Sequence, residues 1–195
     1  TDPEPMRISS DFTHWISNGD MFGHSVSISD NTIFIGAPYK DYNGTWDVGA
    51  VYVYTKNPDE EWSSKYETAK LLPRIKAEKE LFGFSVNSLY NTVIVGAPGD
   101  DYTRSYTPRN LPCRTYIFQS DDYLWENIQP LYDFTGDNFK KDYYGINVYM
   151  DETDFFIGSS IEDLSTGLLS GATYITPTPP MVKLAPPICE TTQTV

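Results

Sequence analysis

The stretch FGHSVSISDNTIFIGAP at Phe22–Pro38 decides the fold, because it recurs as FGFSVNSLYNTVIVGAP at Phe82–Pro98 and, altered, as YGINVYMDETDFFIGSS at Tyr144–Ser160. The central glycines of these copies are Gly36, Gly96 and Gly158, which stand at nearly equal intervals along the chain. A fixed period of this kind is typical of repeat architectures, in which each repeat is one unit packed against its neighbours. The chain is therefore expected to form a row of similar units.

Each copy has the pattern of two strands joined by a tight turn. In the first copy, apolar residues alternate with small or polar ones from Phe22 to Ile28, as in a half-buried strand. A polar turn follows, and then Ile33–Ile35 forms a continuous apolar run, which is typical of a strand buried on both faces. Pro38 ends that strand, because proline lacks the N–H that a central strand must donate.

Two further strands are predicted in each repeat. The third strands are GAVYVY at Gly49–Tyr54, CRTYIF at Cys113–Phe118 and GATYIT at Gly171–Thr176. Trp62–Leu72 is expected to form the fourth strand of the first repeat, and the fourth element of the second is expected around Trp125–Phe134, whereas the third repeat has no obvious fourth strand that bears a tryptophan.

These residues resemble the FG-GAP repeat, the β-propeller blade of integrin α-subunit heads and of many secreted or surface proteins. The resemblance rests on Phe22-Gly23 with Gly36-Ala37-Pro38, on the same residues of the second copy, and on the Gly-Ala-x-Tyr segments at Gly49 and Gly171. It covers roughly residues 15–176 and is closer to the subtype with a short first turn. Integrin-type repeats that bind calcium carry an acidic DxDxDG-like loop there, and these short turns cannot supply six or more oxygen ligands. The resemblance therefore does not imply calcium binding by this chain.

The resemblance implies an all-β fold, a β-propeller-like array of about three four-stranded antiparallel blades that does not close into a ring within one chain. Residues 1–176 are expected to form this single domain, and residues 177–195 to form a Pro/Thr-rich tail. The parts of the domain are an N-terminal strand at 6–15 and blades at about 22–72, 82–134 and 144–176.

Three blades leave the two outer faces open, since propellers typically close with four to eight blades. The chain is then a fragment of a longer propeller, part of a ring with other chains, or a unit that stacks head to tail. The tail could add as a strand to a neighbour's open blade, or complete the chain's own third blade. The residues predicted to mediate assembly are Met181, Val182, Leu184 and Ile188 in the tail and Met6, Ile8, Phe12 and Trp15 in the N-terminal segment.

Composition narrows the range of partners. The net charge of −13 disfavours nucleic acid and anionic membranes, and the chain has no apolar run long enough to span a membrane. Cys113 and Cys189 could form a disulfide in an oxidising compartment, within one chain or between chains. Asn43 begins an N-glycosylation sequon, and Thr178 is a candidate for O-glycosylation. Together these features favour a secreted or cell-surface protein.

No catalytic signature or cofactor motif is present, and the chain is not expected to be an enzyme. The acidic residues Asp41, Asp47, Asp100 and Asp101 are weak candidates for a metal site, and they are interpreted as solvated loop charges. A hydrolase that uses loop carboxylates is the third and least favoured reading.

The leading hypothesis is an extracellular structural protein that binds copies of itself head to tail, as the protomer of a filament. The alternative is an integrin-like adhesion module that recognises a protein or glycan through its blade loops.

Overall fold

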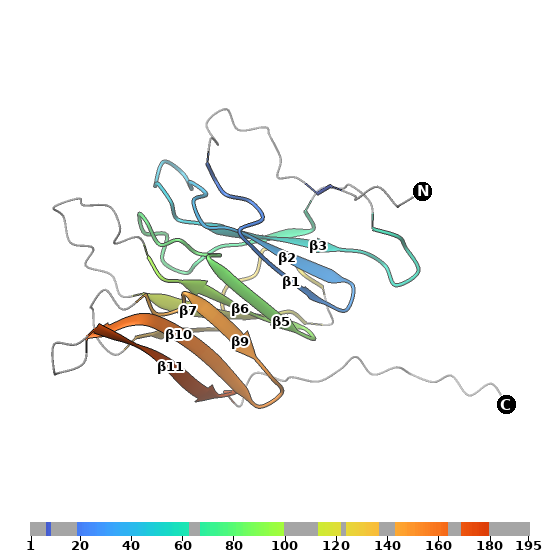
Figure 1. The fold of residues 1–195 in the computed structure, drawn as a ribbon. Helices are drawn as coiled ribbons and strands as arrows, with labels where there is room; N and C mark the ends of the chain where they lie inside the picture. Colours follow the sequence, from blue (N-terminus) through green and yellow to red (C-terminus); the bar gives the residue numbers. More distant parts are fainter. Residues whose placement is uncertain are drawn as a thin grey trace, which may run out of the picture.

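The computed structural model describes residues 7–8, 19–62, 67–99, 113–121, 124–136, 143–163 and 169–179 of the 195-residue chain. Within these ranges the structure is all β and consists of three antiparallel sheets, none of which closes on itself (Figure 1). The predicted fold class is confirmed. None of the described residues belongs to a helix that is long and apolar enough to cross a membrane.

The three sheets follow the three repeats in order. The first blade contains β1 (Ser25–Ser29), β2 (Thr32–Ala37), β3 (Ala50–Thr55) and β4 (Ala69–Leu71), paired in that order. The second contains β5 (Ser85–Leu89), β6 (Thr92–Ala97), β7 (Arg114–Gln119) and β8 (Tyr132–Thr135). The third contains β9 (Asn147–Met150), β10 (Asp154–Asp163) and β11 (Leu169–Pro177), and β11 is its last strand in the part of the chain described.

The turns that join the first two strands of each blade follow from the sequence. Asp30 and Tyr90 adopt the left-handed conformation (φ 51° and 52°) in the two short turns. The third hairpin has the same pairing distance, Met150 with Phe155, and the Asp151 carboxylate closes its turn by accepting the N–H groups of Thr153 and Asp154, each at 2.8 Å. These bonds, together with one from the Thr153 hydroxyl, lower the pKa of Asp151. The third repeat therefore keeps its hairpin although its turn has a different sequence.

The blades stack side by side through their first strands. β5 lies between β1 and β9, and the sheets fan outward from this row (Figure 1). Each blade thus has a forward face, turned toward the next blade in sequence, and a rear face, turned toward the preceding one. Because side chains alternate along a strand, Ser25 and Ser27 of β1 belong to the forward face, and Val26 and Ile28 belong to the rear face.

The fourth strands are shorter than the segments in which they were expected. β4 occupies the end of the segment predicted at Trp62–Leu72, and β8 covers the end of the one predicted at Trp125–Phe134. Both tryptophans lie before the strand and serve as packing residues. Trp125 is buried, and its ring meets that of Phe34 edge-on at 4.7 Å between centroids. The fourth strand is therefore short in both blades, and the tryptophan of each repeat packs against an apolar cluster from the segment before that strand.

The apolar core lies mainly between the blades. Forward-face residues Phe34, Val51 and Val53 of the first blade form one cluster with rear-face residues of the second, which include Phe82, Val95, Tyr116 and Phe118. Ile94 and Ile117 on the forward face of the second blade form the next cluster with Tyr144, Met150, Phe155 and Ile157 of the third. Two of the three apolar clusters are consequently shared between neighbouring blades.

Replacing Gly96 by alanine is expected to destabilise the chain by about 3 kcal/mol, at the upper end of what overpacking a core costs. A Cβ at this position would collide with the backbone carbonyl of Gly145 in the next blade and with the Ser85 hydroxyl. Urea denaturation of the dilute chain, followed by tryptophan fluorescence, measures the change.

Gly158 provides the matched control, because it is the equivalent glycine of the third blade. Its Cβ would meet only Asn147, no closer than 3.5 Å, so that Gly158→Ala should change the free energy of unfolding by less than about 0.5 kcal/mol. Equal losses in the two variants would show that the contact between blades does not set the cost.

Candidate functional site

The joint between neighbouring blades is built from a serine and two glycines, and it occurs twice. Ser25 Oγ donates to the carbonyl oxygen of Gly83 at 2.8 Å, and Ser85 Oγ donates to that of Gly145 at the same distance. The receiving glycines are the second residues of the Phe-Gly and Tyr-Gly pairs. Their left-handed backbone (φ 90° and 87°) turns the carbonyl toward the preceding blade.

The same joint requires a second glycine on the forward face. A Cβ at Gly36 would overlap the carbonyl of Gly83, as one at Gly96 would overlap that of Gly145. The FG and GAP motifs of one repeat therefore serve different joints: the FG glycine contacts the blade before it, and the GAP glycine contacts the blade after it. This division of roles explains why both motifs recur with one period.

Polar contacts between the first strands add a second point of attachment. Ser27 Oγ accepts the N–H of Ser88 at 2.9 Å, and Asn87 Oδ1 accepts that of Met150 at the same distance. These positions are equivalent in the two joints. His24 adds a further contact at the first joint, where its Nδ1–H donates to the carbonyl of Phe84 at 3.0 Å. Sequence reasoning did not assign Ser25, Ser27, Ser85 and Asn87, although the shared FGxS pattern marks the first position.

The first blade presents a rear half of this joint that no other described residue fills. Gly23 has the same backbone conformation as Gly83 (φ 92°), yet no atom of the described chain lies within 4 Å of where its Cβ would stand. Val26 is 60% exposed, whereas its equivalent Val86 in the second blade is 9% exposed. Ile28 is 58% exposed in the same row. This rear face carries apolar side chains of the kind that the other blades bury.

The third blade presents the complementary forward half. Ile175 of β11 is 63% exposed, whereas its equivalents Val53 and Ile117 are completely buried at the internal joints. Tyr149 of β9, at the place of Ser27 and Asn87, is 58% exposed. Asn147 stands where the other blades have the donor serine. Four of the eight large hydrophobic residues that are exposed in the described chain lie on these two terminal faces: Val26, Ile28, Tyr149 and Ile175.

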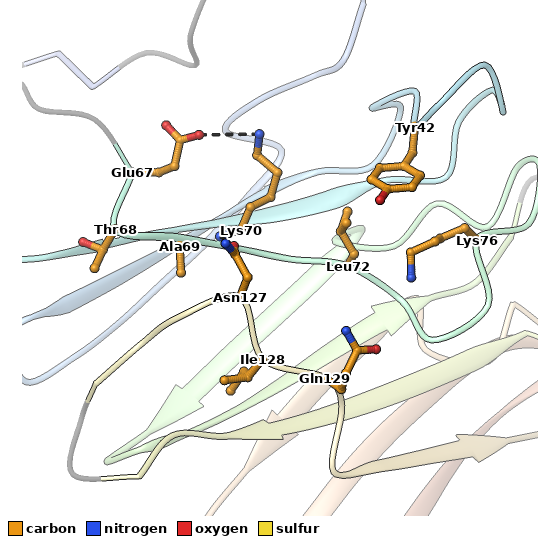
Figure 2. Close-up of a pocket in the computed structure, with 10 residues that line it drawn as sticks. All are labelled: Tyr42, Glu67, Thr68, Ala69, Lys70, Leu72, Lys76, Asn127, Ile128 and Gln129. Atoms are coloured by element: carbon orange, nitrogen blue, oxygen red, sulfur yellow. Dashed lines mark hydrogen bonds and ion pairs between the residues drawn. The ribbon is translucent and has the colours of Figure 1, made fainter.

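A groove of about 750 Å³ lies between the outer strand of the first blade and the segment before β8 (Figure 2). Asn127 Oδ1 accepts the backbone N–H of Lys70 at 3.0 Å, which covers part of the free edge of β4. Lys70 and Glu67 form an ion pair at 3.5 Å on one side of the groove. On the other side, the Lys76 ammonium lies 5.8 Å from the centroid of the Tyr42 ring. The lining offers an aromatic ring, amides and charges of both signs to a polar ligand.

The remaining predicted sites have different outcomes. Asn43 is exposed in a turn with a left-handed backbone, where a glycan has room. The hydroxyl oxygen of Thr178 is buried, which disfavours a glycan at that position. Asp41 Oδ1 accepts the backbone N–H of Asp47 at 2.9 Å, and no group of three or more potential metal ligands occurs in the described ranges. Asp100 and Asp101 lie outside them.

No disulfide occurs among the described residues. The Cys113 thiol donates to the carbonyl of Pro98 at 2.7 Å. Cys189 lies outside the described residues, so its pairing with Cys113 stays a prediction. Of the residues predicted to mediate assembly, Ile8 is described, and it packs against the rear-face cluster of the first blade, as Phe22 does. The others, Met6, Phe12, Trp15, Met181, Val182, Leu184 and Ile188, lie outside the described ranges.

Ser85→Ala is expected to cost about 1–3 kcal/mol of stability, because the buried carbonyl of Gly145 would lose its donor. Asn147→Ala, at the equivalent position of the third blade, is the control. Asn147 is exposed, so this change should cost less than about 0.5 kcal/mol. Thermal unfolding followed by circular dichroism compares the two, and a joint that did not depend on this bond would leave both variants alike.

The comparisons with known proteins agree with this architecture. Residues 16–54, which include the first two strands and most of the third, match the family model of the FG-GAP repeat. A comparison with characterised proteins finds none that matches the chain. The resemblance seen in the sequence is confirmed for the first repeat, which matches the FG-GAP repeat, and the described part of the chain has a blade-like, all-β structure.

Proposed function

We propose that this protein is a structural element whose copies associate head to tail, each through the forward face of its third blade and the rear face of its first. One observation carries the proposal: the two ends of the blade row are complementary halves of a joint that the chain uses twice internally. A contact between unlike faces leaves one free face at each end, so it continues into a filament unless the rotation closes a ring.

An extracellular setting and a non-enzymatic role belong to the same proposal. FG-GAP repeats are typically extracellular, and the exposed Asn43 sequon fits that setting. His24, one of the two histidines, is engaged in the joint between the first two blades, where its ring also packs on Phe84 at 4.5 Å between centroids. Packing and hydrogen bonding thereby account for His24 without a catalytic role. Copies of the chain are the proposed partners, and no cofactor is invoked.

The groove in Figure 2 favours a second candidate function, that of an adhesion module. Tyr42 and Lys76 on one side, with Gln129 across the groove from them, could contact a glycan or a peptide. This function requires a chain that is monomeric and that binds a separate partner through its loops. Surface glycans and surface proteins are the partners that it would take.

The mass and shape of the native particle distinguish the two functions. Head-to-tail association is expected to give light-scattering masses well above the 22.1 kDa of one chain, and elongated particles with a regular axial repeat in negative stain. A particle of 22.1 kDa at every concentration tested would contradict self-association and leave the adhesion module as the better account.

A further inference from the structure

The contact between copies can be specified to the residue, because the fourth strand of each blade leads directly into the next blade. Leu71 of β4 pairs with Val51, and Phe134 of β8 pairs with Thr115, at equivalent places in the first two blades. Leu71 and Phe134 each pack against the rear-face cluster of the blade that follows. One repeat separates them along the chain.

Ile8 precedes Leu71 by the same interval that separates Leu71 from Phe134, and it occupies the same kind of place. It packs against the rear-face cluster of the first blade, which contains Ile35, Tyr52 and Tyr54. In position and packing Ile8 thus corresponds to a fourth strand, but the blade to which that strand would belong is not one of the three sheets.

No fourth strand of the third blade occurs among the described residues. Its sheet ends at β11 in the described part of the chain (Figure 1), whereas the first two sheets each continue to a fourth strand, β4 and β8. Thr173 of β11 is the equivalent of Val51 and Thr115, the residues that pair with Leu71 and Phe134. A free sheet edge readily accepts another strand.

We propose that Arg7–Ile8 of one copy forms the fourth strand on β11 of the preceding copy, with Ile8 opposite Thr173, while Gly23 docks on Gly158 as Gly83 docks on Gly36. The occupant of the open face is therefore a second copy of this chain. The inference rests on the proposed head-to-tail association and defines its register. It also assigns the missing strand to the N-terminal segment instead of the C-terminal tail.

At the proposed joint between copies, some positions carry different side chains from those at the internal joints, and these side chains are complementary to each other. The internal joints place polar groups between the first strands, as in Ser27 with Ser88. At the joint between copies the equivalent positions are Tyr149 on the forward face and Ile28 on the rear face, both exposed in the single chain. Burying two apolar side chains against each other favours association. Apolar side chains that are exposed in one chain and face each other in the assembly are what an interface between copies requires.

Complementation between two blocked variants tests the contact. Gly158→Ala places a methyl group where the carbonyl of Gly23 would dock, so the forward face fails and the rear face stays intact. Ile28→Asp puts a charge on the rear face and leaves the forward face intact. Each variant alone is expected to be monomeric, and an equimolar mixture is expected to form a dimer of twice the 22.1 kDa of one chain.

Two matched variants separate the failure of this joint from the failure of self-association. Ile175→Asp should block assembly as Gly158→Ala does, whereas Leu124→Asp, at an apolar site of similar exposure away from both faces, should assemble like the unaltered chain. If the unaltered chain assembled and Gly158→Ala and Ile175→Asp did so equally well, this joint would be wrong and self-association would stand. Loss of assembly only on deletion of residues 177–195 would assign the contact to the tail. An unaltered chain that was monomeric would overturn both proposals.

Disulfide trapping in the complementing dimer tests the register. Ile8→Cys is added to the Gly158→Ala chain and Thr173→Cys to the Ile28→Asp chain, because residues directly opposite in antiparallel strands have Cβ atoms about 4.5–5.5 Å apart. After mild oxidation, peptide mass spectrometry should find positions 8 and 173 joined. Ile175→Cys in place of Thr173→Cys is the control, two positions out of register. Equal trapping at 173 and 175, or at neither, would contradict the pairing.

Discussion

The close approach of two glycine backbones between neighbouring blades is the constraint on which the rest of the structure depends. The carbonyl of Gly83 lies where a side chain on Gly36 would begin, and the carbonyl of Gly145 is placed in the same way against Gly96. Each carbonyl oxygen accepts a hydrogen bond from a serine hydroxyl of the preceding blade, at 2.8 Å between the oxygen atoms. The approach fixes how far apart the first strands lie, and so which apolar side chains meet between the blades.

A joint of this kind makes the chain directional. Every blade offers a serine or asparagine and a GAP-type glycine forward, and an FG-type glycine backward, so the halves are unlike and fit only in one order. Three blades form two internal joints, so one rear half on the first blade and one forward half on the third blade stay unused within the described chain. The exposed apolar side chains gather on those two remaining faces because their equivalents in the internal joints are positions of burial. The proposed self-association uses the same geometry that folds the chain.

Much of this could be predicted from the sequence, and the limits have physical causes. The constant period of the motif and the alternation of apolar residues predicted the blades and the short first turn, because these depend on local pattern. The extent of the fourth strands was predicted too long, because Trp62 and Trp125 look like strand residues but pack from outside the strand. The role of Ser25 and Ser85 was not predicted, since a serine after an FG pair reveals no partner until the next blade is placed.

The sequence by itself determined the repeat, the all-β class, the acidic net charge and the number of blades, because periodicity and composition are properties of the chain alone. Only the tertiary structure decided which side of each strand faces forward. It also showed that Gly36 and Gly158 differ although their motifs correspond, and that Ile8 stands in the row of Leu71 and Phe134. These are relations between segments that lie one or more repeats apart, and no local preference encodes them, since they arise only when one blade packs against the next.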